Sequence, residues 1–193
     1  MNEIVEREVK YLLSQGMYEK FNQLFPWTKS YWQVNHYYSP KDKIHSKMTI
    51  RIRQVDCDLR LEIKHILSKE PRIAKEYSKT VDKIKYNILC NEIYEISGIK
   101  CDAVYYIGDL ITFRKEYEYS EGVKICLDQS FYMGKIDYEL EIEYVNKYPI
   151  DLVEKIENIY GVTIQHKGKY TRFIENYNTL YKENVLSSIK MKK

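Results

Sequence analysis

The strongest constraint on the fold is a strict alternation of charged and uncharged residues in segments spread along the chain. The clearest case is DYELEIEY at residues 137–144, where four acidic residues alternate with Tyr, Leu and Ile. Alternation with a period of two is typical of a β-strand whose two faces meet different surroundings. The same pattern occurs in EREVK (6–10), TIRIR (49–53), DLRLEIK (58–64) and VKICLD (123–128). These segments predict an antiparallel sheet with one strongly charged face.

Turn and capping signals complete the expected order of elements. Short turns with Gly122 and Gly134 join three consecutive strands into a meander of hairpins. Helices are predicted over 14–25 with Ser14 as N-cap, between residues 80 and 89, and over 150–161 with Asp151 as a candidate cap and Gly161 past its end. The resulting class is α+β.

A last helix is predicted from about residue 170. Its apolar residues fall on one helical stripe, formed by Phe173, Ile174, Tyr177, Leu180 and Tyr181. Such a stripe is expected to pack against the body of the protein.

Composition narrows the class of protein. A chain of 193 residues with no linker-like stretch is expected to be one domain, residues 1–193. The net charge of +3 is too balanced to predict nucleic-acid binding, and no apolar run approaches the roughly 18 residues of a membrane span. Four scattered cysteines without a CxxC pair favour reduced thiols in a cytoplasm. No glycine-rich phosphate loop follows a strand, which disfavours P-loop and dinucleotide-binding folds.

Electrostatics distinguishes two ways to build the charged face. One is an open sheet whose charged face is exposed to solvent, which is common among antiparallel sheets. However, neighbouring carboxylates on one face of a strand are only about 7 Å apart and repel each other unless cations lie nearby. A closed barrel with its charged faces inward would pair acidic with basic rows. The acidic row would then bind magnesium or manganese, and the arginines and lysines a phosphate, as metal-assisted phosphoryl transfer requires.

Several motifs, in order, resemble those of the CYTH domain family, the triphosphate tunnel metalloenzymes. EREVK resembles the ExExK signature, TIRIR the LRxR strand and LEIK a later strand that ends in lysine. GDLITFR, LDQSFYMGKIDYELEIE and HKGKYTRF resemble a strand with a tunnel arginine, a stretch ending in a metal-binding ExE and a C-terminal basic motif. The resemblance extends over nearly the whole chain and is closest to small single-domain bacterial members. It implies an eight-stranded antiparallel β-barrel, with flanking helices, that forms a tunnel for a triphosphate.

The resemblance also implies roles for individual residues. The implied metal ligands are Glu6, Glu8, Glu139 and Glu141. The residues implied to bind substrate are Lys10, Arg51, Arg53, Lys64, Arg114, Lys169 and Arg172. Those expected to take part in catalysis are Glu6, Glu8, Lys10, Arg53 and Glu141.

Three positions depart from the family pattern, and a fourth adds a weaker match. Phe113 stands where members often carry a second lysine, which would remove one phosphate contact. Gly168 stands where a serine is usual. Glu143 extends the acidic row, so the acidic assignment could shift by one step along the strand. Glu76 is a further candidate for an acidic tunnel position.

The expected activity is hydrolysis of the terminal phosphate of a triphosphate, with Mg²⁺ or Mn²⁺ as cofactor. Inorganic triphosphate is favoured over thiamine triphosphate and nucleoside triphosphates because it uses only the phosphate-binding face. Two alternatives remain, a class IV-type adenylate cyclase and a polyphosphate- or nucleotide-binding module without turnover. The expected partner is a triphosphate-containing small molecule, with no nucleic acid and no membrane. The chain is expected to be cytoplasmic, as a monomer or a homodimer.

Overall fold

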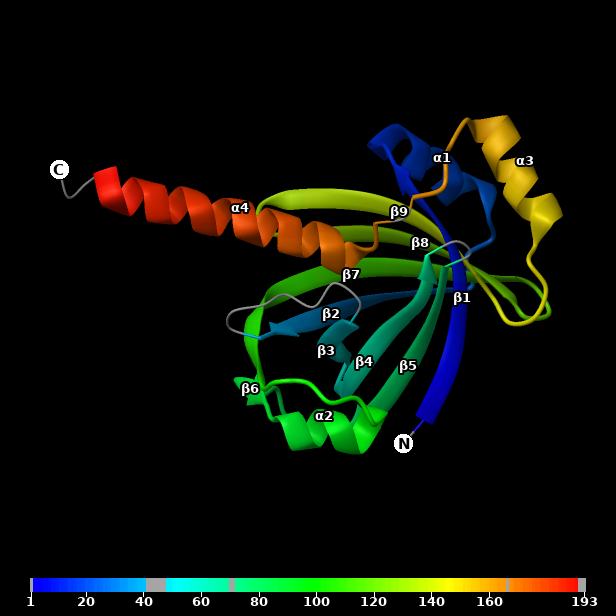
Figure 1. The fold of residues 1–193 in the computed structure, drawn as a ribbon. Helices are drawn as coiled ribbons and strands as arrows, with labels where there is room; N and C mark the ends of the chain where they lie inside the picture. Colours follow the sequence, from blue (N-terminus) through cyan, green and yellow to red (C-terminus); the bar gives the residue numbers. More distant parts are fainter. Residues whose placement is uncertain (1, 41–47, 70–71, 166, 191–193) are drawn as a thin grey trace.

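Strands dominate the fold, with helices packed around them (Figure 1). The computed structural model describes residues 2–40, 48–69, 72–165 and 167–190. The strands are β1 (Asn2–Leu13), β2 (Lys29–Ser39), β3 (Met48–Val55), β4 (Asp58–Lys69), β5 (Arg72–Thr80), β6 (Asn87–Ile88), β7 (Val104–Ser120), β8 (Val123–Tyr132) and β9 (Lys135–Tyr144). The helices are α1 (Gln15–Leu24), α2 (Cys90–Ser97), α3 (Ile150–Tyr160) and α4 (Lys169–Lys190).

Eight of the strands close into an antiparallel barrel, which confirms the predicted fold class. Around the barrel, the order is β1, β5, β4, β3, β2, β7, β8 and β9, and β9 pairs again with β1. The β2–β7 pairing, over residues 29–39 and 105–116, is the one that joins the two halves of the sheet. The short β6 pairs only with the start of β7, outside the ring.

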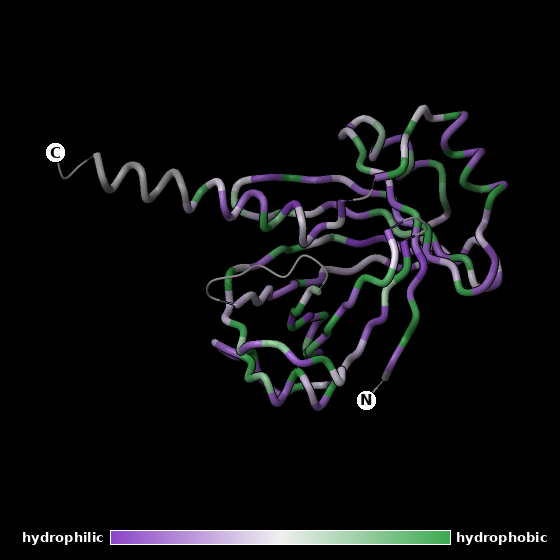
Figure 2. The backbone as a smooth tube through the Cα atoms, in the orientation of Figure 1, coloured by the Kyte–Doolittle hydropathy of each residue, from purple (hydrophilic) through white to green (hydrophobic). Residues whose placement is uncertain are grey.

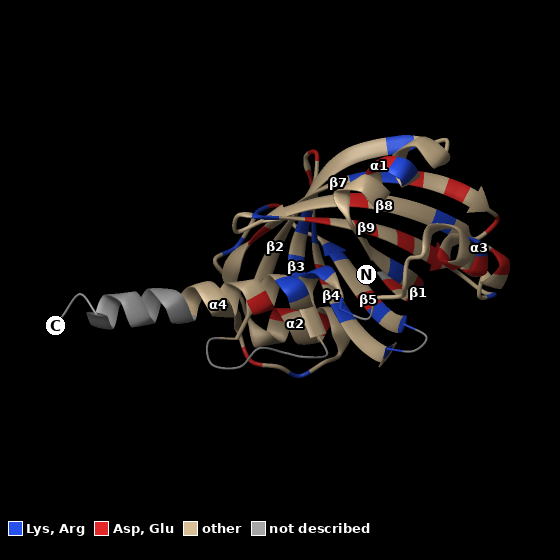
Figure 3. Ribbon diagram, turned by 90° about the horizontal axis from the view of Figure 1, so that it is seen from above, with Lys and Arg blue, Asp and Glu red and all other residues tan. Residues whose placement is uncertain are grey.

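The alternation seen in the sequence separates the inside of the barrel from its outside. The apolar faces of β1, β8 and β9 point outward and form a core with α1 and α3, in which Tyr11, Leu140 and Ile142 are fully buried. A second outer core joins β3, β4 and β5 to α2. Figure 2 shows apolar and polar residues alternating along the strands, and Figure 3 shows the positions of the charged residues. The acidic and basic faces therefore point into the barrel, because the apolar faces of these strands pack outward against helices.

The first turn of α4 fills one end of the barrel. Phe173 is fully buried and packs against Tyr37, Leu110 and Tyr132. Leu110 lies on the same face of β7 as Arg114, so these contacts lie inside the ring. The rest of α4 projects away from the barrel (Figure 1), and Leu180 and Tyr181 are exposed. The predicted stripe thus packs on the body only at its beginning.

The expected helix starts and turns are mostly confirmed. The hydroxyl of Ser14 accepts a hydrogen bond from the Met17 amide at the start of α1. Gly122 and Gly134 have positive φ in the two hairpin turns, and Gly161 ends α3 in the left-handed region. Asp151, however, is not the cap of α3, because Pro149 precedes the helix and Asp151 lies in its first turn.

The predicted helix between residues 80 and 89 is wrong. Ile88 belongs to β6 and is fully buried, whereas Ile84 and Leu89 are about half exposed. Their helix-like spacing therefore does not correspond to one buried face. The helix, α2, begins only at Cys90, after the predicted range, and the Glu92 carboxylate accepts a hydrogen bond from the Leu89 amide. The strand β5 was not predicted from the sequence. None of the helices in the described ranges is long and apolar enough to cross a membrane.

Candidate active site

The interior of the barrel contains a cavity of about 940 Å³ lined by charged side chains from most strands and from the start of α4. The predicted site residues that line it are Glu6, Glu8, Lys10, Arg51, Arg53, Lys64, Arg114, Glu141 and Lys169. Glu139 and Arg172 are the predicted residues outside this lining, and their side chains pair with each other, with Arg172 Nη2 2.8 Å from Glu139 Oε2. The fold therefore brings the predicted residues together, although they come from distant parts of the sequence.

The acidic wall is built by the pairing of β1 with β9. In this register Glu8 is the partner of Glu143, and Lys10 is the partner of Glu141. All four side chains line the cavity. Glu143 thus lies in the cavity wall, whereas Glu139, two residues before Glu141 on β9, lies at the end covered by α4. The shift of the acidic assignment by one step is therefore compatible with the geometry.

Every carboxylate of the acidic row on β9 has a basic partner. Asp137 lies 2.8 Å from Arg172, Glu139 lies 2.8 Å from Lys169, and Glu143 lies 2.8 Å from Lys124. Glu141 contacts Lys10, and it lies 2.6 Å from Lys169 and 2.5 Å from Arg114. These cations offset the repulsion expected within the row.

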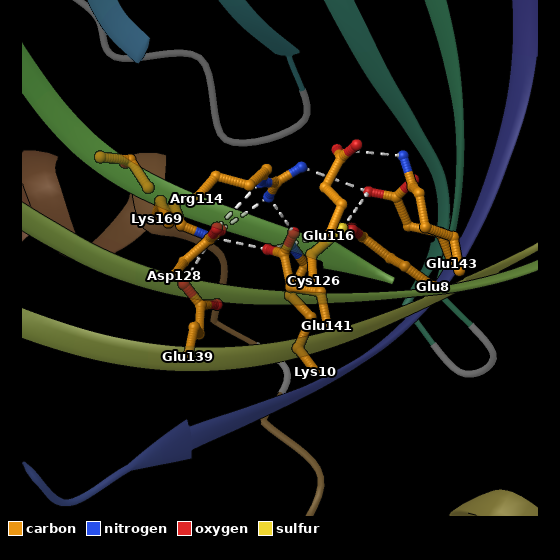
Figure 4. A network of polar contacts seen from close by, with 12 residues as sticks. Glu8, Lys10, Arg114, Glu116, Cys126, Asp128, Glu139, Glu141, Glu143 and Lys169 are labelled. Atoms are coloured by element: carbon orange, nitrogen blue, oxygen red, sulfur yellow. Dashed lines mark hydrogen bonds and ion pairs between the residues drawn. The ribbon is translucent and has the colours of Figure 1, made fainter. Parts of the chain in front are cut away.

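Arg114 and Asp128 form the centre of this network (Figure 4). The Arg114 guanidinium donates two hydrogen bonds to Asp128, of 2.8 and 2.6 Å, in a bidentate arrangement. Lys169 lies 2.8 Å from the same carboxylate, which is fully buried. Asp128 was not among the predicted site residues, although it shares the charged face of β8 with Lys124.

The opposite wall carries the basic rows of β3 and β4. Arg51 donates a hydrogen bond of 2.8 Å to Glu62, and Arg53 donates one of 3.0 Å to Asn35. Lys64 contacts the Glu6 carboxylate and lies 3.3 Å from Glu8, so it reaches across the interior to β1. The cavity therefore has basic groups on both sides of its acidic wall.

Ion pairing keeps the buried carboxylates charged. Burial favours the neutral form of Glu139, but Lys169, Lys10 and Arg172 outweigh this effect and lower its pKa to about 2. The pKa of Glu76 is likewise lowered to about 2, because Lys64 and Arg51 outweigh the effect of burial. Burial opposes the charged form of Lys10 too, yet Glu141 and Glu8 raise its pKa above the ordinary value. The cavity is thus strongly ionised at neutral pH.

A divalent metal would find hard oxygen ligands on the acidic wall. Glu8 Oε2 is buried and accepts no hydrogen bond, although it lies 2.9 Å from Lys10 Nζ. Carboxylate oxygens of this kind suit Mg²⁺ or Mn²⁺. Within the described residues, no three Asp, Glu, His or Cys side chains already converge as metal ligands do. The donor set fits a divalent cation, provided that the basic partners move aside.

Two departures from the family pattern have a structural explanation. Phe113 lies on the outer face of β7, where its ring packs 5.0 Å from that of the exposed Trp32. A side chain at this position points away from the cavity, so the expected loss of a phosphate contact at Phe113 is wrong. Gly168 lies against the guanidinium of Arg72, a cavity residue that the sequence analysis did not find.

Comparison with solved structures gives the same fold. A putative adenylate cyclase from Bacillus halodurans is 24% identical, with a TM-score of 0.71, over 90% of this chain and 99% of that chain. A putative adenylyl cyclase from Hippeastrum, described as having a dominant triphosphatase activity, is 20% identical, with a TM-score of 0.68, over 89% of this chain and 96% of that one. A third protein, PH1012 from Pyrococcus horikoshii, is 17% identical, with a TM-score of 0.60, over 87% and 98%.

The family itself follows from the sequence. No curated protein sequence matches the chain. A sequence model of the CYTH domain, however, matches residues 5–174, which run from β1 into α4. With this match and the closed barrel around a charged cavity, the chain belongs to the CYTH domain family.

Proposed function

We propose that this protein is a metal-dependent hydrolase that releases the terminal phosphate of a triphosphate bound inside the barrel, with inorganic triphosphate as the preferred substrate. Members of the family are triphosphatases or cyclases and are generally dependent on a divalent metal. The observation that carries the proposal is the cavity itself, in which basic rows and an acidic wall face the same enclosed space. Basic groups bind a polyanion, and carboxylates bind the cation that accompanies it.

The basic residues would bind and orient the substrate. Arg51, Arg53 and Lys64 approach the cavity from one side, and Arg114 and Lys169 from the other. In phosphoryl transfer, most of the catalytic effect comes from such positioning and from stabilisation of charge on the phosphoryl oxygens. The arginines are suited to this role because a guanidinium matches two phosphate oxygens at once.

The acidic residues would hold the metal. Glu6, Glu8, Glu141 and Glu143 line the wall between the two basic groups. A bound divalent metal supplies Lewis-acid polarisation of the phosphoryl group. Water attacks the terminal phosphorus, the bridging P–O bond breaks, and the products are phosphate and diphosphate. Lys10 and Arg114, both close to Glu141, are placed to stabilise the charge that develops on the departing diphosphate.

The experiment is a panel of substrates with magnesium or manganese. Phosphate release from tripolyphosphate, thiamine triphosphate and ATP is measured alongside formation of cyclic AMP. We expect tripolyphosphate to be hydrolysed fastest and cyclic AMP not to form. Cyclic AMP from ATP, without phosphate release from tripolyphosphate, would instead establish the cyclase. Tight binding of tripolyphosphate without any turnover would instead support the alternative of a binding module without catalytic activity.

Matched variants connect activity to the cavity. Glu8→Gln and Glu141→Gln are expected to lower phosphate release at least about 100-fold, because each removes a charge from the metal-binding wall. Glu154→Gln is the control, since Glu154 is exposed on the outer surface of α3. Full metal-dependent activity in Glu8→Gln or Glu141→Gln would show that the acidic wall is not the site.

A further inference from the structure

Arg72 is a charged residue of the cavity without a role in the motifs described above. It begins β5, where it is the strand partner of Glu8 on β1. Its side chain lines the cavity and is only 13% exposed, and its Nε donates a hydrogen bond of 2.5 Å to Glu8 Oε1. Arg72 therefore belongs to the interior of the barrel and not to its outer surface.

Three basic groups surround the single carboxylate of Glu8. Besides Arg72 at 2.5 Å, Lys10 lies at 2.9 Å and Lys64 at 3.3 Å. Lys10 also pairs with Glu141, and Lys64 with Glu6, so these cations are shared among several carboxylates of the acidic wall. A bound polyanion can therefore take over part of the contacts of these cations when a metal binds the carboxylates.

Gly168 makes space for the guanidinium. A Cβ atom at residue 168 would lie 2.7 Å from Arg72 Nη2, which is too close for the guanidinium to stay where it is. The backbone of Gly168 is not in the left-handed region, so other residues could adopt its conformation. A side chain at residue 168 would therefore displace the Arg72 guanidinium from this position, although the backbone there would accept it.

We propose that Arg72 is an additional phosphate-binding residue of the cavity, and that Gly168 is the residue that allows its guanidinium to reach this position. The inference rests on the proposed function, because it assumes that a triphosphate enters the barrel. On binding, the guanidinium exchanges part of its contact with Glu8 for phosphate oxygens beside the acidic wall. A guanidinium is suited to such an exchange because carboxylate and phosphate match the same fork of N–H groups.

The test measures binding of the imido analogue of triphosphate, whose P–N–P bridges resist hydrolysis, by calorimetry with Mg²⁺. Arg72→Gln is expected to weaken binding by about 10- to 100-fold, the effect of losing a charged hydrogen bond. Arg72→Lys, which keeps the charge but not the fork, is expected to recover only part of the loss. Lys75→Ala is the matched control, because Lys75 is a basic residue of the same strand that pairs with Glu3 on the outer surface.

A double-mutant cycle tests the role of Gly168. Gly168→Ala is expected to weaken binding in the presence of Arg72 but to add no further loss to Arg72→Gln, since the residue that needs the space is then absent. Equal losses in both backgrounds would overturn the assignment of Gly168.

Binding of Mn²⁺ in the absence of the analogue distinguishes two roles for Arg72. It could contact phosphate, or it could only position the Glu8 carboxylate. If Arg72 binds phosphate, Arg72→Gln leaves Mn²⁺ affinity unchanged or raises it, because a cation beside Glu8 has been removed. A loss of Mn²⁺ affinity as large as the loss of analogue binding would show that Arg72 only positions Glu8, and would overturn the proposal. Unchanged analogue binding in Arg72→Gln would do the same, with the proposed function intact. Failure of the unsubstituted protein to bind the analogue would overturn both.

Discussion

Glu8 on β1 and Glu143 on β9 are direct partners in the antiparallel pairing of the two strands, and both side chains line the cavity. The Cβ atoms of such partners lie about 5 Å apart, so the two carboxylates share one region of the interior. Glu139, which the motif comparison assigned to the metal, lies instead outside the cavity lining and is 1% exposed. The pairing therefore favours Glu143 over Glu139 as the second acidic ligand.

This difference can be measured as affinity for Mn²⁺. We expect Glu143→Gln to weaken Mn²⁺ binding at least about 10-fold, because it removes a ligand charge from the wall that Glu8 shares. Glu139→Gln should change Mn²⁺ binding little, but should lower the free energy of unfolding by about 1–3 kcal/mol, because Glu139 accepts hydrogen bonds from buried basic groups. Calorimetric titration and chemical denaturation give the two quantities. The reverse order of the two variants in the titration would restore Glu139 as the ligand.

Metal and triphosphate should bind cooperatively. In the ligand-free protein the acidic and basic groups of the cavity neutralise each other, as Lys64 does with Glu6 and Lys124 with Glu143. A metal alone would leave basic groups without partners, and a triphosphate alone would leave carboxylates without partners, so each ligand removes a cost of binding the other. We expect the imido analogue to raise Mn²⁺ affinity by about 5- to 150-fold, with an equal effect of Mn²⁺ on the analogue. Independent binding would contradict this coupling.

The free energy of unfolding should fall steeply as the solution becomes acidic. The pKa values of Glu76 and Glu139 are about 2, compared with 4.5 for an ordinary glutamate, because neighbouring basic groups outweigh burial. A carboxylate with a lowered pKa in the folded state stabilises the protein above pH 4.5, and this contribution is lost as the pH falls towards 2. For a fully paired, buried group it amounts to up to about 3 kcal/mol.

Denaturant midpoints measured from pH 7 to pH 2 at constant ionic strength test this prediction. We expect Glu76→Gln to be less stable than the unsubstituted protein at pH 7 and to lose less stability between pH 4.5 and 2. A difference between the two proteins that does not change with pH would mean that Glu76 is not held charged by Lys64 and Arg51.

The sequence predicted the barrel because alternation was strong where a strand has helices on one side and charges on the other. The β9 segment is the best example, since Leu140 and Ile142 are fully buried outside the barrel while Glu139 and Glu141 are paired inside it. Alternation did not predict the structure correctly in segments that do not lie between the charged interior and an outer layer of helices. Around Ile84, an irregular segment happened to have helical spacing, and α2 begins only after it.

Most residues of the candidate site were predicted through the family motifs, with the alternation indicating only which faces are charged. Lys10 and Arg53 were assigned through the family motifs that they match, and both lie on strongly alternating strands. Asp128 had the same signal and was missed because no motif singled it out. Arg72 had no such signal, since its place in the cavity depends on the pairing of β5 with β1 and on the space left by Gly168. These are contacts between distant segments, which periodicity within one segment does not reveal.

The apolar end of the barrel gives the last prediction. Phe173 is fully buried against Tyr37 and Tyr132, and its ring lies only 3.1 Å from where a Cβ of Gly108 would stand. Phe173→Ala should therefore leave a cavity and lower the free energy of unfolding by about 3–5 kcal/mol. It should also lower activity, because Lys169 and Arg172 are held in place by the same turn of α4. Tyr181→Ala, on the exposed part of this helix, is the control and should change neither quantity. A Phe173→Ala variant as stable and active as the unsubstituted protein would mean that α4 does not close this end.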